Sequence, residues 1–287
     1  MILFFKNKFI FLKFCGKCLG LFVILLLLLI GSRGAYASFE PGKWPCAYLA
    51  RGSSGIAVGH LQNGFLVNPA LLNLKAANQI SLFYRNYYTI SDLNDLSLSA
   101  EFSFYKIPVG FTFSQFGDKN YREQTMSIAA AWSPVKNLSL GAAAQMFLLN
   151  VKRYGKSSAF GTILSLHYQI MPKFSLAAVA GNLNEPKLSD RRGAVPVYFL
   201  TGFEFLPVDN LSLSLDIFKD NQFDFDFRYG LGYRLISSIE ILLGFRQQVH
   251  AVTAGIQINK LMVHFGYALE MHPDLGISNA IEVAYVF

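Results

Sequence analysis

Apolar and polar residues alternate with a period of two along most of the chain after residue 78. Residues 211–217 read Leu-Ser-Leu-Ser-Leu-Asp-Ile, and residues 223–228 read Phe-Asp-Phe-Asp-Phe-Arg. Successive side chains of a β-strand point to opposite faces, so this period predicts strands with one apolar and one polar face. No segment after residue 37 is apolar for the roughly 20 residues that a membrane-spanning helix needs.

Fourteen segments carry this alternation, and most of them are nine to thirteen residues long. They lie near residues 79–89, 96–106, 107–116, 124–133, 137–150, 158–170, 174–182, 195–206, 210–218, 222–234, 238–247, 250–259, 261–270 and 277–287. A tilted membrane-spanning β-strand needs about 9–11 residues. The composition agrees with strands that face lipid, because 53% of the residues are hydrophobic and only 15% are charged, against about 25% charged in ordinary soluble domains.

The connections between these segments alternate in length. After every second segment there is a tight turn such as residues 133–136, whereas residues 117–123, 151–157 and 182–194 form longer, more polar connections. Outer-membrane barrels have this pattern. We therefore predict an all-β fold, a transmembrane antiparallel β-barrel of about 14 strands over residues 79–287. The alternative is a soluble secreted β-sandwich, whose strands would be shorter and whose apolar content would be lower.

The first 37 residues have the layout of a signal peptide. Four lysines precede an apolar run over residues 19–30, and Ala35-Tyr36-Ala37 follows as a cleavage site. We expect export and cleavage after Ala37, and the alternative is a permanent N-terminal anchor. Residues 1–37 hold five basic side chains and no acidic one, so residues 38–287 keep 20 basic and 18 acidic side chains. This balance leaves no basic patch for nucleic acid.

The polar positions of the strands are expected to face the barrel lumen. The predicted lumen charges are Glu101, Asp216, Asp224, Asp226, Arg228, Glu240, Arg246 and Glu282, with Glu204, Glu270, His167 and His264 at equivalent positions. Charges inside a membrane protein either line a wet path or pair with one another. Both signs occur close together here, which favours a lumen that is held shut by ion pairs.

Catalytic and metal-binding patterns are missing from the sequence. The nearest nucleophile and base are Thr253 and His250, which lie beside a connection and lack the G-x-S-x-G motif. Cys46 is the one cysteine after residue 37, so neither an internal disulfide nor a cysteine metal site is expected. We predict a protein that is not an enzyme and needs no cofactor, with a barrel enzyme acting on lipid as the least favoured alternative.

Residues 38–78 do not alternate, and they include the small-residue stretch 50–59 and the triplet Asn68-Pro69-Ala70. Proline fixes its own φ and favours an extended residue before it, so the triplet predicts a rigid turn. A Gly/Ala-rich segment that leads to Asn-Pro-Ala before the first strand resembles the start of the long-chain fatty-acid transporter (FadL-type) superfamily and its PorV/PorQ-like relatives. The resemblance implies that residues 38–78 form a plug, with Asn68, Pro69 and Ala70 as its motif.

The last segment ends in Ala284-Tyr285-Val286-Phe287. A terminal alternating strand that closes on an aromatic residue resembles the assembly signal of bacterial outer-membrane proteins, with Phe287 as the signal residue. The two resemblances imply a Gram-negative outer-membrane protein that passes or holds a hydrophobic small molecule, or that serves a protein-export machine. Its expected partners are outer-membrane lipid, a hydrophobic ligand, the barrel assembly machinery and secretion-system proteins. A plugged structural or anchoring barrel without transport is the alternative.

Overall fold

A computed structural model describes most of the chain after the predicted signal peptide. The described residues are 39, 44–74, 78–105, 107–189 and 193–287. The predicted signal peptide and its cleavage site lie outside the described residues. No described helix is both long and apolar enough to cross a membrane.

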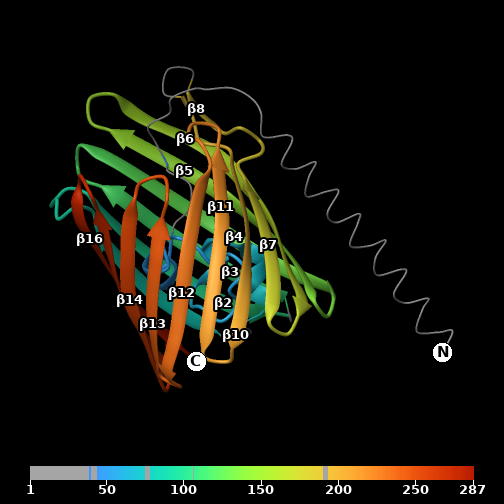
Figure 1. Cartoon of the computed structure of the whole chain (residues 1–287). Helices are drawn as coiled ribbons and strands as arrows, with labels where there is room; N and C mark the ends of the chain where they lie inside the picture. The colour runs from blue at the N-terminus through green and yellow to red at the C-terminus, as the bar shows by residue number, and fades with distance from the viewer. Residues whose placement is uncertain (1–38, 40–43, 75–77, 106, 190–192) are drawn as a thin grey trace, which may run out of the picture. The chain divides into compact units, whose positions relative to one another are not determined.

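Fourteen antiparallel strands form a closed barrel (Figure 1). They are β1 (Gln79–Asn86), β2 (Asn94–Phe104), β3 (Ile107–Gly117), β4 (Tyr121–Val135), β5 (Leu138–Val151), β6 (Gly155–Met171), β7 (Phe174–Gly181), β10 (Tyr198–Val208), β11 (Leu211–Asp220), β12 (Asp226–Ile236), β13 (Ile239–Arg246), β14 (Ala251–Lys260), β15 (Val263–His272) and β16 (Gly276–Val286). The barrel closes where β1 pairs with β16, from Gln79 opposite Val286 to Asn86 opposite Asn279. The predicted fold and strand number are confirmed.

The two ends of the barrel differ in their connections. Two-residue connections such as 136–137 and 209–210 lie at one end, which we call the turn end. Longer loops such as 87–93 and 182–197 lie at the other, which we call the loop end. The longest loop carries a small two-stranded sheet, β8 (Lys187–Ser189) with β9 (Gly193–Ala194), which the alternation did not predict.

Several predicted strand bounds differ from the structure by two or three residues, and the largest difference is at β12, which begins at Asp226 and not near residue 222. The Asp220 carboxylate accepts hydrogen bonds from the backbone N–H groups of Gln222 and Phe223. This side-chain turn competes with the strand ladder for those two donors. The alternating Phe223 and Phe225 therefore lie in an exposed loop.

The strands turn their apolar faces outward and their polar faces into the lumen. On β2, Leu98 is 50% exposed, whereas the neighbouring Ser99 is only 4% exposed. An apolar outer band around a polar interior is the pattern of a transmembrane barrel. The closed ladder and the exposed apolar face exclude a soluble sandwich, in which the apolar faces would be buried against each other.

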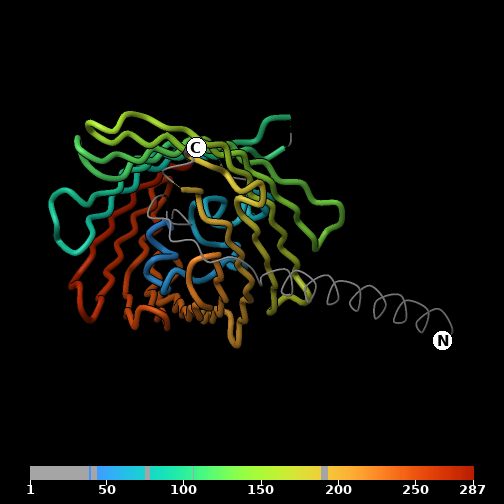
Figure 2. The backbone as a smooth tube through the Cα atoms, turned by 90° about the horizontal axis from the view of Figure 1, so that it is seen from above, coloured from blue at the N-terminus to red at the C-terminus, as the bar shows by residue number. Residues whose placement is uncertain are grey.

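The lumen is occupied by residues 44–74, which we call the inner segment. It contains the short helix α2 (Cys46–Ala50) and the 3-10 helices η1 (Gly64–Leu66) and η2 (Pro69–Asn73). Figure 2 shows this blue part of the chain inside the ring of strands. Its apolar side chains pack on the inner wall in buried clusters, for example Tyr48 and Leu61 with Leu242. The core of the molecule is thus the contact between the inner segment and the wall.

Candidate functional site

The triplet Asn68-Pro69-Ala70 begins η2 and attaches it to the wall. Asn68 is extended, with φ −146° and ψ 99°, and its Oδ1 accepts a hydrogen bond from the Ala70 N–H at 3.0 Å. Its Nδ2 donates to the Ile56 carbonyl at 2.8 Å, which ties two parts of the inner segment together. On the wall, Ser139 Oγ donates to the Ala70 carbonyl at 2.6 Å.

Glycines of the wall let the inner segment approach its backbone. A Cβ at Gly141 on β5 would collide with the backbone of Pro69 and Ala70. A Cβ at Gly244 on β13 would collide in the same way with the backbone of Arg51 and Gly52. The wall is therefore shaped for this segment at two separate places in the lumen.

Arg51 anchors the start of the inner segment. Its side chain is fully buried, and Nη2 donates to Ser212 Oγ at 3.1 Å and to Ser214 Oγ at 3.0 Å. Burial lowers the pKa of the Arg51 guanidinium, while the carboxylates of Glu240 and Glu204 act in the opposite direction. Sequence reasoning missed this residue, although a lone charge within a Gly/Ala/Ser stretch was the available signal.

Two lumen residues of the wall hold the backbone of the inner segment. The Asp216 carboxylate accepts hydrogen bonds from the Gly55 N–H at 2.7 Å and from the Ile56 N–H at 3.1 Å. Thr253 Oγ1 accepts from the Gly52 N–H at 2.8 Å and donates to the Ala50 carbonyl at 2.9 Å. Since its hydroxyl is engaged in this way, Thr253 has a structural role.

A cluster of paired charges lies at the loop end of the lumen. Glu270 accepts from Arg85 at 3.1 Å and lies 3.9 Å from Arg246. Asp226 lies 2.7 Å from Nε of Arg228 and 3.7 Å from Arg246. Two carboxylates, from β12 and β15, thus join three guanidinium groups, from β1, β12 and β13, into one network.

The loop-end cluster also contacts the inner segment. The guanidinium carbon of Arg228 lies 5.1 Å from the centre of the Trp44 ring and 4.2 Å from that of Phe218. Cation–π contacts of this kind add to packing where water is excluded. The start of the inner segment is therefore held beneath the charged network.

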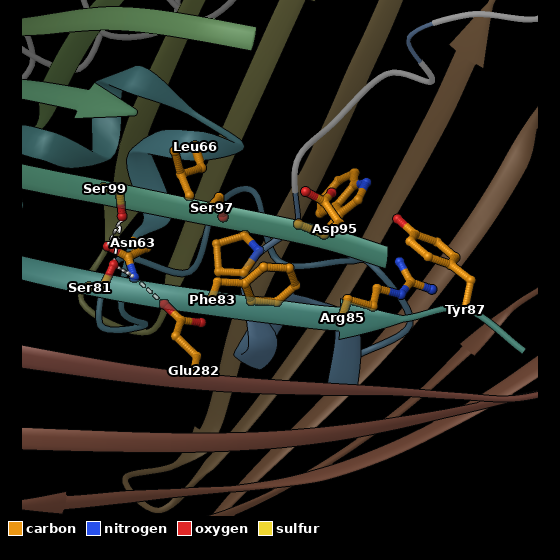
Figure 3. A pocket seen from close by; sticks show the side chains of 12 residues that line it. Asn63, Leu66, Ser81, Phe83, Arg85, Tyr87, Asp95, Ser97, Ser99 and Glu282 are labelled. Carbon is orange, nitrogen blue, oxygen red and sulfur yellow. Dashed lines mark hydrogen bonds between the residues drawn. The ribbon is translucent and has the colours of Figure 1, made fainter. Parts of the chain in front are cut away.

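Polar contacts at the turn end hold the inner segment to β1, β2 and β16. Asn63 donates to Ser81 Oγ at 2.8 Å and to the Glu282 carboxylate, and Ser99 Oγ donates to Asn63 at 3.2 Å (Figure 3). The other Glu282 oxygen accepts from the Cys46 N–H at 2.7 Å. These contacts cross the seam where the barrel closes.

His60 makes a second attachment at the turn end. Its Nδ1 lies 3.7 Å from Glu204 and its Nε2 lies 3.3 Å from Glu240. These carboxylates come from β10 and β13, so one imidazole of the inner segment contacts two different strands. Sequence reasoning placed both glutamates at lumen positions but assigned no role to His60.

The structure places most of the predicted lumen charges in the interior. The buried ones are Glu101, Glu204, Asp216, Asp226, Arg228, Glu240, Glu270, Glu282 and His167. Arg246 and His264 are half-buried on inward-facing positions. Asp224 was predicted wrongly, since it lies exposed in the loop 221–225 that the Asp220 turn creates.

Little free space remains beside the inner segment. Between it and strands β1 and β2 is a cavity of about 20 Å³, which Figure 3 shows from close by. A second cavity of about 40 Å³ is lined by Phe65, Phe147, Ile163 and Tyr198 and is entered by Phe39. Spaces of this size hold one or a few water molecules. Neither of these two cavities has room for a small organic molecule.

Phe39 is one of the residues that line the second cavity. Its ring lies 5.0 Å from that of Phe147, and its backbone N–H donates to the Glu123 carboxylate at 3.1 Å. The same carboxylate accepts from Tyr121 Oη at 2.5 Å. An aromatic side chain thus occupies this part of the lumen, near the loops of β4 and β5.

The described residues hold no group of three or more His, Cys, Asp or Glu side chains that would bind a metal ion. His250 lies exposed in the loop-end connection 247–250. The Thr253 hydroxyl instead points into the lumen, where it donates to the Ala50 carbonyl. These two residues therefore do not form a nucleophile and base pair.

The fold and the occupied lumen define a class, the 14-stranded transmembrane barrel that encloses an N-terminal segment. The structure is similar to the toluene transporter TbuX of Ralstonia pickettii, with a TM-score of 0.66 and 14% identity over 87% of this chain and 100% of that chain. It is similar to the CymD monoaromatic hydrocarbon channel, with a TM-score of 0.65 and 15% identity over 88% and 99%.

A FadL homologue of Pseudomonas aeruginosa is also similar, with a TM-score of 0.55 and 11% identity over 87% of this chain and 99% of that chain. No model of a known protein family matches the sequence. No curated protein matches it either. At these identities the similarity establishes the fold, which is the fold that the sequence resemblance implied.

Proposed function

We propose that this chain is an outer-membrane transporter that passes a hydrophobic small molecule. A transmembrane barrel whose lumen is occupied by a docked segment, with a pocket of mixed aromatic and polar lining toward the loop end, supports the proposal. The similar barrels are described as a toluene transporter and a monoaromatic hydrocarbon channel. The proposal includes residues 1–37 as a cleaved signal peptide and residues 38–78 as the plug.

Passage requires the inner segment to move, because the remaining cavities hold only water-sized molecules. The pocket around Phe39 is the proposed place for the passenger, since Phe147 and Ile163 offer apolar contacts there beside polar side chains such as Thr125 and Gln145. Withdrawal of Phe39 would free this space. The polar contacts of Arg51 and Asp216 would then have to open before the passenger reaches the turn end.

A single substitution can lock the inner segment to the wall. A Cβ at position 266 on β15 would lie 3.2 Å from the Cβ of the native Cys46, close to the roughly 3.5–4.5 Å between Cβ atoms in disulfides. Gly266→Cys therefore offers Cys46 a partner, and no other cysteine is present after residue 37.

The test is uptake of radiolabelled toluene by intact Gram-negative cells that express the protein. Cells with the wild type are expected to take up toluene faster than cells without it. Uptake through oxidised Gly266→Cys is expected to fall to the background and to recover on reduction. Gly266→Ser is the matched control, because it adds a similar side chain without a thiol.

Two outcomes contradict the proposal in different ways. Uptake through the wild type that equals the background would refute transport of this passenger class. Equal uptake through the oxidised and reduced Gly266→Cys protein would show that the inner segment need not move.

The second candidate is a plugged barrel without transport, in an anchoring role or as part of a protein-export machine. The small lumen cavities and the many polar attachments of the inner segment favour it. It predicts no toluene uptake from a fully assembled barrel, in either redox state. Secretion-system proteins would be its partners.

A further inference from the structure

The outer face of β4, β5 and β6 carries two basic side chains near the loop end, with an asparagine between them. Arg122 on β4 is paired with Asn150 on β5, which is paired in turn with Lys156 on β6. Alternation with the inward-facing Glu123 and Ala159 places these three side chains on the outer face. Neighbouring strands lie about 5 Å apart, so Arg122 and Lys156 are about 10 Å apart at their Cα atoms. We call Arg122, Lys156 and the neutral Asn150 between them the basic row.

An apolar groove lies on the same face, nearer the turn end. It has a volume of about 530 Å³, and its lining includes Phe113, Met126, Met146 and Phe160. These four residues are adjacent across β3 to β6, and the small Ala144 leaves room between them and the next row. Met126 and Arg122 are four residues apart along β4, which corresponds to about 13 Å of strand.

A row that is mostly uncharged and polar, with Leu148 of β5 as its apolar member, separates the groove from the basic row. Gln124 on β4 donates to Gln115 on β3 at 3.0 Å, and Ser158 on β6 lies in the same row. The face thus presents apolar groups, then amide and hydroxyl groups, then positive charges. A membrane lipid has the same order, with acyl chains, then ester or amide carbonyls, then a phosphate.

Negative charges on the neighbouring residues are directed elsewhere. The Glu123 carboxylate faces the lumen and accepts from Phe39 and Tyr121. The Asp118 carboxylate accepts from the backbone N–H groups of Asn120 and Tyr121 in its own loop. Nε of Arg122 is buried and has no hydrogen-bond partner among the described residues. The basic row therefore keeps a net positive charge.

The opposite wall has no such arrangement at its loop end. The outward-facing residues near the loop ends of β12 to β16 are Phe227, Phe245, Val252, Met271 and Ile277. These described positions are all apolar. If the basic residues only attracted the barrel to a charged membrane surface in general, they would not have to lie on one wall.

We propose that the outer face of β3 to β6 binds one anionic lipid, with its acyl chains in the groove and its phosphate at the basic row. Charge complementarity selects the occupant, because an uncharged lipid would leave Arg122 and Lys156 without a counter-charge at the edge of the membrane. The proposal rests on the proposed function only in placing the barrel in a membrane.

The test is native mass spectrometry of the barrel in non-ionic detergent with added dioleoyl phosphatidylglycerol or dioleoyl phosphatidylcholine. The wild type is expected to retain the anionic lipid several-fold more than the zwitterionic one. Arg122→Gln with Lys156→Gln is expected to abolish this preference. The matched control, Lys136→Gln with Lys260→Gln, removes two exposed charges at the turn end and is expected to preserve it.

A second variant tests the groove without changing charge. Ala144→Phe fills the groove and is expected to lower retention of the anionic lipid several-fold. A preference that survives in the Arg122 and Lys156 variant, or a wild type without any preference, would overturn the proposal. Each variant is used only if it migrates as a folded barrel before boiling.

Failure of this site and failure of the proposed function are separable. Lipid preference without toluene uptake would refute transport and leave the lipid site in place. Toluene uptake without any lipid preference would refute the lipid site and leave transport in place.

Discussion

At the scale of single residues, the lumen is organised by buried polar groups that bind backbone. Asp216 and Thr253 each hold two backbone groups of the inner segment, and Arg51 reaches from that segment to two serines of β11. A buried polar group is costly unless it is paired. The inner segment is therefore held at defined positions, and removal of one partner leaves the other unsatisfied.

Arg51→Met is expected to loosen the start of the inner segment. It removes the hydrogen bonds to Ser212 and Ser214 and takes the guanidinium away from Glu204 and Glu240, which keep only their contacts with other groups such as His60, at a cost of about 1–3 kcal/mol. Hydrogen exchange of peptides from residues 45–58 is then expected to be roughly 5–150-fold faster. Lys173→Met removes an exposed cation at the turn end and serves as the control. Unchanged exchange in Arg51→Met would contradict the anchoring role.

At the scale of elements, the inner segment and the wall have complementary surfaces. Gly141 and Gly244 lie where the backbone of the inner segment touches the strands, and the apolar residues of α2 and η2 pack between these points. Interiors are packed so closely that a single added side chain has to be accommodated by a shift. The docking of the segment is thus sensitive to small changes on the inner face.

Gly141→Val is expected to displace η2 from β5, because its side chain would collide with Pro69 and Ala70. Overpacking of this kind typically costs about 1–3 kcal/mol. Limited proteolysis is expected to cut residues 66–74 faster than in the wild type. Ala142→Val adds a similar volume on the outer face of the same strand. In this variant the protease is expected to cut residues 66–74 at the wild-type rate. Equal rates for both variants would refute the close docking.

The last strand is the element whose sequence we propose as the assembly signal. Phe287 is exposed, stacks on Tyr285 at 6.2 Å, and its N–H donates to the Asn78 carbonyl at 2.9 Å beside the barrel seam. Phe287→Ala keeps this backbone hydrogen bond and removes only the ring. We expect several-fold less assembled barrel in the outer membrane of expressing cells but normal refolding in detergent. Normal assembly in cells would show that the ring is not recognised.

At the scale of the whole molecule, closure of the ladder removes every edge strand of the barrel. Each strand pairs on both sides, so backbone groups need no water within the membrane. Such a barrel opens only by breaking a complete ladder, which makes its unfolding slow. The contacts between the inner segment and the wall then stabilise a barrel that the strand ladder has already closed.

We expect heat-modifiability from this closure. The protein refolded in detergent should migrate anomalously on a gel unless it is boiled, and its circular dichroism should be β-rich. A deletion of residues 39–70 should keep this behaviour, because the ladder begins at Gln79, and should raise conductance in planar bilayers. A barrel that loses heat-modifiability with the deletion would show that the inner segment is needed for closure.

Much of the fold followed from the sequence because strand alternation is a local property. Each segment carries its own apolar and polar faces, so the number of strands, the start of β1 at Gln79 and the outward apolar band were all readable. The start of β12 was not, because Asp220 binds backbone groups that the alternation alone assigns to a strand. Asp224 was misplaced for the same reason.

The sequence by itself determined a 14-stranded barrel with a polar lumen and a non-alternating segment before it. Only the tertiary structure decided which lumen charges pair, that Arg51 and His60 attach the inner segment to the wall, and that basic residues gather above an apolar groove on β3 to β6. The reason is physical: alternation acts between adjacent residues, whereas these contacts join residues far apart in sequence, and their partners depend on the strand register that closure imposes.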